Sequence, residues 1–194
     1  MKNQTSQSGF TLIELIAVMV ILAILAAVVI PRITTVQEGA YESNVINMHG
    51  AIRNYVSNKA LKNAISGGRG METYDEPVQT DGNYYLETWI KDFDRDKWTQ
   101  QQDANGGTTG AGSNTTPDRI LFKYEPHGAG QGVLKDIYWI EYFPTTSASA
   151  AADAYTWDTF ELIAYKDDDG AGQDNGSFTR AHEVQIAGAV IDGP

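Results

Sequence analysis

The sequence predicts an α+β protein in which one long N-terminal helix packs on a C-terminal antiparallel β-sheet. Three observations predict this fold. An apolar run of 21 residues extends from Phe10 to Ile30. Apolar residues then recur at helical spacing as far as Tyr55, and strand-like runs separated by polar turns follow after Pro117. A helix followed by a run of strands is typical of the α+β class.

The apolar run is long enough to cross a membrane. At about 1.5 Å per residue, its 21 residues span roughly 30 Å as a helix, the hydrocarbon thickness of a bilayer. Fourteen of them are Leu, Ile, Val or Phe, and the one charged residue is Glu14. A carboxylate inside such a span costs about 2.5–3.5 kcal/mol. A plain membrane anchor explains the run but not the acid, so Glu14 is expected to have a partner.

The helical pattern continues beyond the apolar run. Five residues recur at spacings of four and three, the pattern of an amphipathic helix: Tyr41, Val45, Met48, Ile52 and Tyr55. We expect this face to pack in the core. Pro31 predicts a kink, or a point where the helix loosens. His49 is expected to be a hydrogen-bonded or an exposed side chain. The helix should run from about residue 10 to about residue 63 and end before Gly67 and Gly68.

The remainder of the chain, residues 64–194, is expected to form a β-rich head. Residues 71–117 are polar, Gly-rich and weakly patterned, and they predict no regular element. Four strand-like runs follow: Ile120–Tyr124, Asp136–Phe143, Thr159–Lys166 and Glu183–Ile191. The polar turns between them favour an antiparallel sheet. The chain has no cysteine, so hydrogen bonds, packing or a metal must hold the C-terminal region.

Charge and motifs argue against two functional classes. Residues 64–194 hold 9 Lys and Arg against 22 Asp and Glu, a net charge of −13. A head of that charge repels phosphate backbones, so no nucleic-acid contact is predicted for it. The sequence has no cysteine nucleophile, no G-x-S-x-G or H-E-x-x-H motif and no phosphate-binding loop. The chain is therefore not expected to be an enzyme.

One acidic, Gly-rich stretch, residues 167–176, is a candidate metal site. Its hard-oxygen ligands would be Asp167, Asp168, Asp169, Asp174 and Asn175. Carboxylates and amides on such a turn suit calcium, which takes 6–8 oxygen ligands. The spacing does not match an EF-hand loop, because no Glu stands at the twelfth position from Asp167. The alternative is a solvated acidic turn that follows a strand.

The stretch Gly9-Phe10-Thr11-Leu12-Ile13-Glu14-Leu15 resembles the type IV prepilin cleavage and methylation motif. Similar N-termini occur on bacterial type IV pilins and on the pseudopilins of type II secretion. The resemblance covers about residues 1–63, including Pro31 at the family's usual helix-kink position. It implies that a prepilin peptidase cuts between Gly9 and Phe10 and that the new Phe10 amine is N-methylated. It also implies that Glu14 pairs with the Phe10 amine of a neighbouring subunit during filament assembly.

The resemblance implies four segments. Residues 1–9 are a leader peptide, 10–30 a transmembrane and filament-core helix, 31–63 its amphipathic continuation, and 64–194 a globular head. Before assembly the chain is a single-pass inner-membrane protein with a periplasmic or extracellular head. The expected partners are other subunits in a helical homo- or hetero-polymer, prepilin peptidase, an inner-membrane assembly platform and membrane lipid.

The expected function is that of a structural subunit, a pilin that polymerises into a type IV pilus for adhesion, motility or DNA uptake. The alternative is a pseudopilin, whose periplasmic pseudopilus serves protein export by type II secretion. The N-terminus does not separate the two. The size of the head and its glycine–threonine loop at residues 105–117 favour a surface pilin. The acidic stretch at residues 167–176 favours a pseudopilin, because similar pseudopilins use a C-terminal calcium loop.

Overall fold

The computed structural model describes residues 9–66, 73–75, 77, 82–103, 119–131, 134, 136–145, 157–167, 178–181 and 183–191. The chain forms two compact units, Met1–Ala40 and Tyr41–Pro194. Helix α1, Leu12–Ser66, begins in the first unit and ends in the second. Its bounds confirm the predicted helix to within three residues, and it ends directly before Gly67.

In the first unit, α1 carries an apolar surface that this chain does not cover. The large apolar side chains between Phe10 and Ile33 are 48–91% exposed. Among the described residues, α1 is the one helix long and apolar enough to cross a membrane, judged by length and composition. The helix continues through Pro31. An apolar surface of this extent requires lipid or other protein chains around it.

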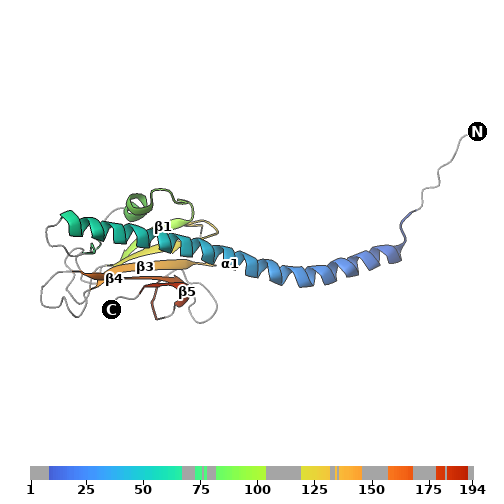
Figure 1. The fold of residues 1–194 in the computed structure, drawn as a ribbon. Coiled ribbons are helices and arrows are strands. Elements are labelled where there is room, and N and C mark those ends of the chain that lie inside the picture. The colour runs from blue at the N-terminus through green and yellow to red at the C-terminus, as the bar shows by residue number, and fades with distance from the viewer. Residues whose placement is uncertain are drawn as a thin grey trace, which may run out of the picture. The chain divides into compact units, whose positions relative to one another are not determined.

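The second unit contains a five-stranded antiparallel sheet whose spatial order follows the sequence (Figure 1). The strands are β1 (Trp98–Asp103), β2 (Arg119–Tyr124), β3 (Tyr138–Thr145), β4 (Thr159–Lys166) and β5 (Val184–Ile191). Strands β2 to β5 confirm the four predicted runs to within two residues. Strand β1 corrects the expectation that residues 71–117 hold no regular element.

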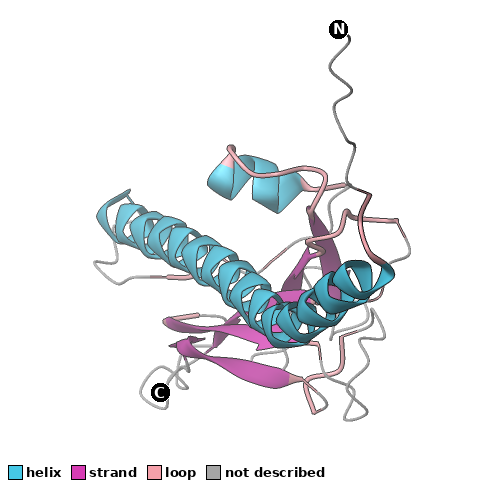
Figure 2. Cartoon of the chain, turned by 90° about the vertical axis from the view of Figure 1, so that its right-hand side faces the viewer, coloured by secondary structure: helices cyan, strands magenta, loops and turns pink. Residues whose placement is uncertain are grey.

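Strand β1 was not predicted because its sequence lacks the alternation of apolar and polar residues that marks a strand. Side-chain hydrogen bonds support it instead. Its sequence after Trp98 is Thr-Gln-Gln-Gln-Asp. The Gln100 amide N–H donates to the Asn83 side-chain oxygen at 2.9 Å, and the Tyr85 N–H donates to Gln100 Oε1 at 2.7 Å. Asn83 directly precedes a short helical segment that includes the π-helix η1, Leu86–Ile90, the smaller helix in Figure 2. Asn83 and this segment therefore supply a hydrogen-bond acceptor for one backbone N–H at the edge of the sheet and hold the Gln100 side chain there.

Residues 41–66 of α1 lie across one face of the sheet (Figures 1 and 2). Val45, Met48 and Ile52 are buried, and the flanking Tyr41 and Tyr55 pack partly buried against the same core. The strands supply alternate residues to this core, among them the fully buried Ile120, Phe122, Ile140 and Leu162. The predicted core face of the helix is confirmed.

His49 lies within this contact between helix and sheet. It is 5% exposed, and its Nε2 is 2.9 Å from the backbone carbonyl oxygen of Leu162, to which it donates a hydrogen bond. It is therefore hydrogen-bonded, the first of the two expected outcomes. Burial lowers the pKa of His49 below the ordinary 6.5. The hydrogen bond to Leu162 opposes part of this effect, and the nearby Arg53 cation lowers the pKa a little further.

This environment predicts that acid destabilises the fold through His49. Because the folded protein holds His49 neutral to a lower pH than the unfolded chain does, the unfolded chain binds more protons below about pH 6.5. The free energy of unfolding should fall as the pH drops below that value, by at most about 1.4 kcal/mol per pH unit for one proton. Urea unfolding of the full chain in detergent from pH 5 to 8 measures it. The His49→Gln variant should lose part of the slope, and an unchanged slope would contradict the assignment.

Candidate functional site

The beginning of α1 holds the one acid of the apolar run. The Thr11 backbone N–H and the Thr11 hydroxyl each donate to Glu14 Oε2 at 2.8 Å. The Glu14 N–H lies 3.4 Å from Thr11 Oγ1, which accepts from it. With α1 starting at Leu12, Thr11 is the N-cap and Glu14 the third helical residue, the arrangement of a capping box. Glu14 thus has a partner in its own chain. This contact was not predicted from the sequence, although the Thr-x-x-Glu spacing is a signal for it.

The other predicted processing residues lie beside this cap. Gly9 and Phe10 directly precede Thr11 and are exposed. A Cβ placed on Gly9 meets nothing within 4 Å, and Phe10 is 91% exposed. Pro31 is not part of this cluster, because it lies roughly five helical turns beyond Glu14. The structure therefore leaves Gly9 and Phe10 exposed on the two sides of the predicted cut, next in the chain to the Thr11 cap that holds Glu14.

The predicted calcium ligands fall mainly outside the described residues. Asp167 follows β4, is 1% exposed, and its backbone N–H donates to the Ile137 carbonyl oxygen at 2.9 Å. Asp168, Asp169, Asp174 and Asn175 lie outside the described residues. Within the part of the chain that the structure describes, no three His, Asp or Glu side chains are placed to hold a metal ion. Calcium binding therefore stays a prediction.

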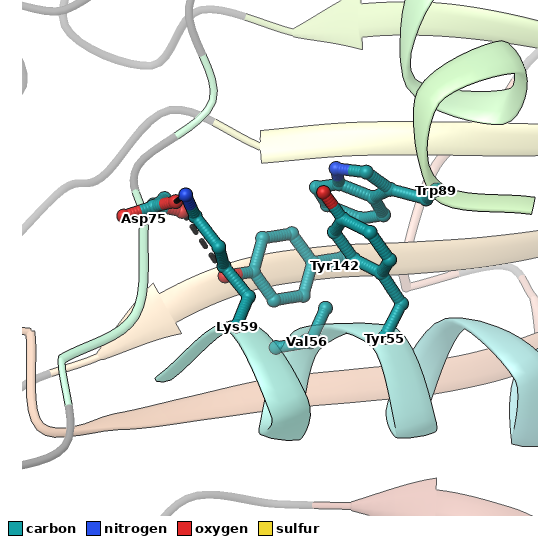
Figure 3. Close-up of a pocket in the computed structure, with 6 residues that line it drawn as sticks. All are labelled: Tyr55, Val56, Lys59, Asp75, Trp89 and Tyr142. Carbon is teal, nitrogen blue, oxygen red and sulfur yellow. Dashed lines mark hydrogen bonds and ion pairs between the residues drawn. The ribbon is translucent and has the colours of Figure 1, made fainter. Parts of the chain in front are cut away.

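A small pocket lies where α1 meets the sheet and the segment of chain between α1 and β1 (Figure 3). Its lining consists of Tyr55, Val56, Lys59, Asp75, Trp89 and Tyr142. Lys59 Nζ is 3.8 Å from Asp75 Oδ2, and the Tyr142 hydroxyl donates to the Asp75 carbonyl oxygen at 3.0 Å. The pocket holds about 20 Å³, enough for roughly one water molecule. Its residues join structural elements and do not form a substrate-sized site.

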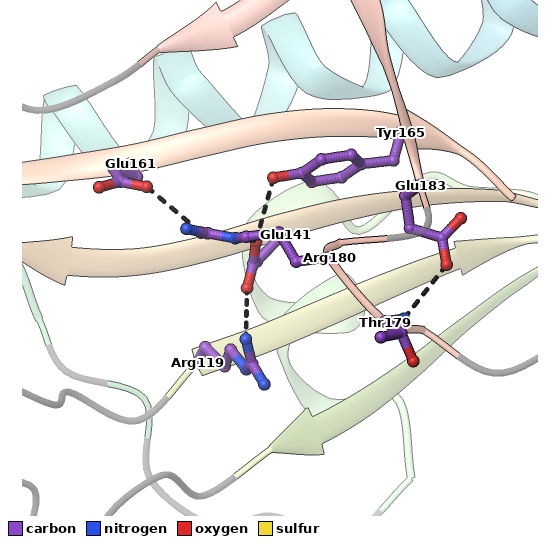
Figure 4. A network of polar contacts seen from close by, with 7 residues as sticks. All are labelled: Arg119, Glu141, Glu161, Tyr165, Thr179, Arg180 and Glu183. Carbon is purple, nitrogen blue, oxygen red and sulfur yellow. Dashed lines mark hydrogen bonds and ion pairs between the residues drawn. The ribbon is translucent and has the colours of Figure 1, made fainter. Parts of the chain in front are cut away.

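A buried acid lies on the sheet face opposite to the helix (Figure 4). The Glu141 side chain is fully buried and meets the Arg119 guanidinium at 2.9 Å and the Arg180 guanidinium at 2.7 Å. Arg180 also reaches Glu161 at 3.2 Å. The sequence did not predict that Arg119, Glu141 and Arg180 meet. The available signal was Glu141 itself, an acid that shares its side of the strand with the buried Trp139.

The N-terminal region of the chain matches a known sequence motif. A family model described as a prokaryotic N-terminal methylation motif matches residues 4–30. The type II secretion system core protein G of Vibrio cholerae serotype O1 (strain ATCC 39315 / El Tor Inaba N16961) is 31% identical over 102 residues, which cover 50% of this chain and 70% of that relative. The chain belongs to the bacterial type IV pilin and type II secretion pseudopilin family. No solved structure matches it.

Membership of the pilin and pseudopilin family fits the two units of the structure. Members are structural subunits that polymerise with one another and are processed by prepilin peptidase. The apolar first half of α1 makes this chain a membrane-anchored subunit, and the helix followed by an antiparallel sheet is the α+β fold of a pilin. The family match includes the predicted processing residues Gly9 and Phe10 and the predicted assembly residue Glu14.

Proposed function

We propose that this chain polymerises through the first half of α1 into a filament, with no catalytic role of its own. The observation that carries the proposal is the one acid of an apolar surface, held at the very start of that surface by Thr11. Packing of the apolar segments of neighbouring subunits would remove their 48–91% exposed side chains from solvent or lipid. A charge retained inside such a core needs an opposite charge.

The proposed partner of Glu14 is the amine that processing creates. Cleavage between Gly9 and Phe10 would remove the leader, residues 1–9, and leave an N-methylated ammonium on Phe10. Both hydrogen bonds from Thr11 fall on Glu14 Oε2, and we propose that Oε1 meets the Phe10 amine of a neighbouring subunit. Each charge would offset the desolvation cost of the other in the filament core.

Two kinds of filament agree with the fold. The relative is named as a type II secretion core protein, and this favours a pseudopilus that serves protein export. The match covers half of this chain, and the size of the head with its glycine–threonine loop favours a surface pilus. In both cases the proposed topology is a single inner-membrane span with the head, residues 64–194, in the periplasm or outside the cell. Assembly would involve an inner-membrane platform.

Deletion of the gene separates the two filaments. A pseudopilin deletion should leave exported proteins in the periplasm, with surface filaments unchanged. A pilin deletion should remove filaments from the sheared surface fraction, with export unchanged. Mass spectrometry of the culture medium and electron microscopy of sheared material measure both results. If export and filaments both persist, the proposed function is wrong.

The calcium hypothesis predicts a cation-dependent stability. If Asp167 and the acidic residues after it bind calcium, the melting temperature of the full chain in detergent should be higher in calcium than in chelator. Calorimetry with magnesium at the same ionic strength is the control, since it matches screening but prefers a smaller, octahedral site. A melting temperature that is independent of calcium would leave the solvated acidic turn as the explanation.

A further inference from the structure

The segment directly before β5 lies on the sheet face opposite to the helix. This segment, the clasp, consists of Phe178, Thr179 and Arg180. The Phe178 ring centre is 5.7 Å from that of Trp139 and 5.3 Å from that of Tyr165. Trp139 and Tyr165 are buried in a second apolar cluster, separate from the core beneath α1. The clasp therefore covers part of a core that the helix does not touch.

Arg180 fixes the clasp to two strands (Figure 4). Its Nε donates to Glu141 Oε2 at 2.9 Å, and its Nη2 lies 2.7 Å from the same carboxylate and 3.2 Å from Glu161. The guanidinium also lies 4.8 Å from the centre of the Phe143 ring. Glu141 and Phe143 belong to β3, and Glu161 belongs to β4. One side chain thus ties the segment before β5 to the middle of the sheet.

The charges make this contact asymmetric. Glu141 is completely buried, whereas the Arg180 side chain is 42% exposed. When the clasp leaves the face, Arg180 gains water, whereas Glu141 keeps the Arg119 guanidinium and the Tyr165 hydroxyl, which donates to its Oε2 at 3.4 Å. A buried carboxylate that loses one of its two cations raises the free energy of the open state. This difference in free energy favours the closed clasp.

The contacts between the clasp and the strands are side-chain contacts. The Thr179 N–H donates to the Glu183 carboxylate at 3.1 Å, a partner only four residues away. Release of the clasp would therefore break the Arg180 and Phe178 contacts without breaking ladder hydrogen bonds of β2, β3 and β4. Elements held in this way open locally, at a lower free energy than global unfolding.

We propose that Phe178 and Arg180 form a releasable clasp, anchored by Glu141, that opens and closes over the Trp139–Tyr165 face while the core beneath α1 stays folded. In a chain without cysteine, this clasp secures the segment leading into β5. Its open state exposes an aromatic surface on the head that its closed state covers. The proposal concerns the head alone and does not depend on filament assembly.

Hydrogen exchange of the full chain in detergent tests the clasp. In the Arg180→Gln variant, amide exchange in peptides covering residues 178–191 should rise about tenfold or more, a value that allows for the partial exposure of Arg180. Peptides from residues 41–66 and from β2 should keep their wild-type exchange. The matched control is Arg95→Gln, which removes an exposed pair with Glu87 and should leave residues 178–191 unchanged.

Two further results complete the test. Arg180→Lys keeps the charge but not the forked geometry, so it folds with a milder defect and should give a smaller rise in the same peptides. In a Glu141→Gln background, Arg180→Gln should lose most of its effect, because the buried charge that it serves is absent. Unchanged exchange in both Arg180 variants would overturn the proposal. A uniform rise across all peptides would overturn it too, since it indicates global destabilisation.

Discussion

Replacing Glu14 with Gln is expected to abolish filament assembly and to leave a cleaved subunit in the membrane. Gln at the third helical position still accepts from Thr11, so the helix start observed at Thr11 and Glu14 is preserved. The variant removes only the charge. A Phe10 ammonium buried without its counter-charge costs about 3–5 kcal/mol, or roughly 100-fold or more in the affinity of each added subunit.

Electron microscopy of sheared filaments and a gel of cell fractions measure assembly and cleavage separately. Glu38→Gln is the matched control, because it neutralises an acid on the same helix outside the apolar run and should assemble normally. Glu14→Ala removes the charge and also the acceptor for the Thr11 N–H and hydroxyl, so it should be at least as defective as Glu14→Gln. A normal filament yield from Glu14→Gln would show that charge pairing has no role in assembly.

Replacing Gly9 with Val is expected to leave essentially all of the precursor uncut. Gly9 has no side chain, so the backbone of a peptidase can approach it closely, and a branched side chain blocks that approach. The structure itself tolerates the change, because a Cβ on Gly9 meets nothing within 4 Å. Failure of cleavage would therefore reflect recognition by the peptidase and not misfolding of this chain.

N-terminal mass analysis of membrane fractions distinguishes the precursor from a product that begins at Phe10. Gly39→Ala is the matched control, since Gly39 is also open to a Cβ but lies within α1, far along the sequence from the cut. That variant should be processed like the wild type. Efficient processing of Gly9→Val would place the recognition determinant elsewhere.

Local patterns predicted the helix and most of the sheet. The spacing of Val45, Met48 and Ile52 identified the buried face of α1 because helical periodicity is a property of neighbouring residues. Apolar runs identified β2 to β5 for the same reason. Strand β1 was not predicted because its support comes from two side-chain hydrogen bonds, from the Gln100 N–H to Asn83 and from the Tyr85 N–H to Gln100. Neither bond can be anticipated without knowing that the two segments meet.

The candidate sites also differ in how far apart their residues lie in the sequence. The contact of Thr11 with Glu14 spans three residues and was not predicted, although the local Thr-x-x-Glu spacing is a signal for it. The contacts of Glu141 with Arg119 and Arg180 span 22 and 39 residues. They exist because folding brings β2, β3 and the segment before β5 together on one face of the sheet. Sequence alone predicts that a buried acid needs a cation, but it does not tell which of the arginines supplies it.

The order of the strands has a consequence for how the head forms. Each strand pairs with the strand that precedes it in the chain, from β1 through β5. Sheet growth therefore requires only successive loop closures, whose entropic cost is modest, and chains rich in such local contacts fold quickly. The contact of His49 with Leu162, 113 residues apart, is of the opposite kind. We expect the sheet to assemble strand by strand, with docking onto α1 as the slower, final step.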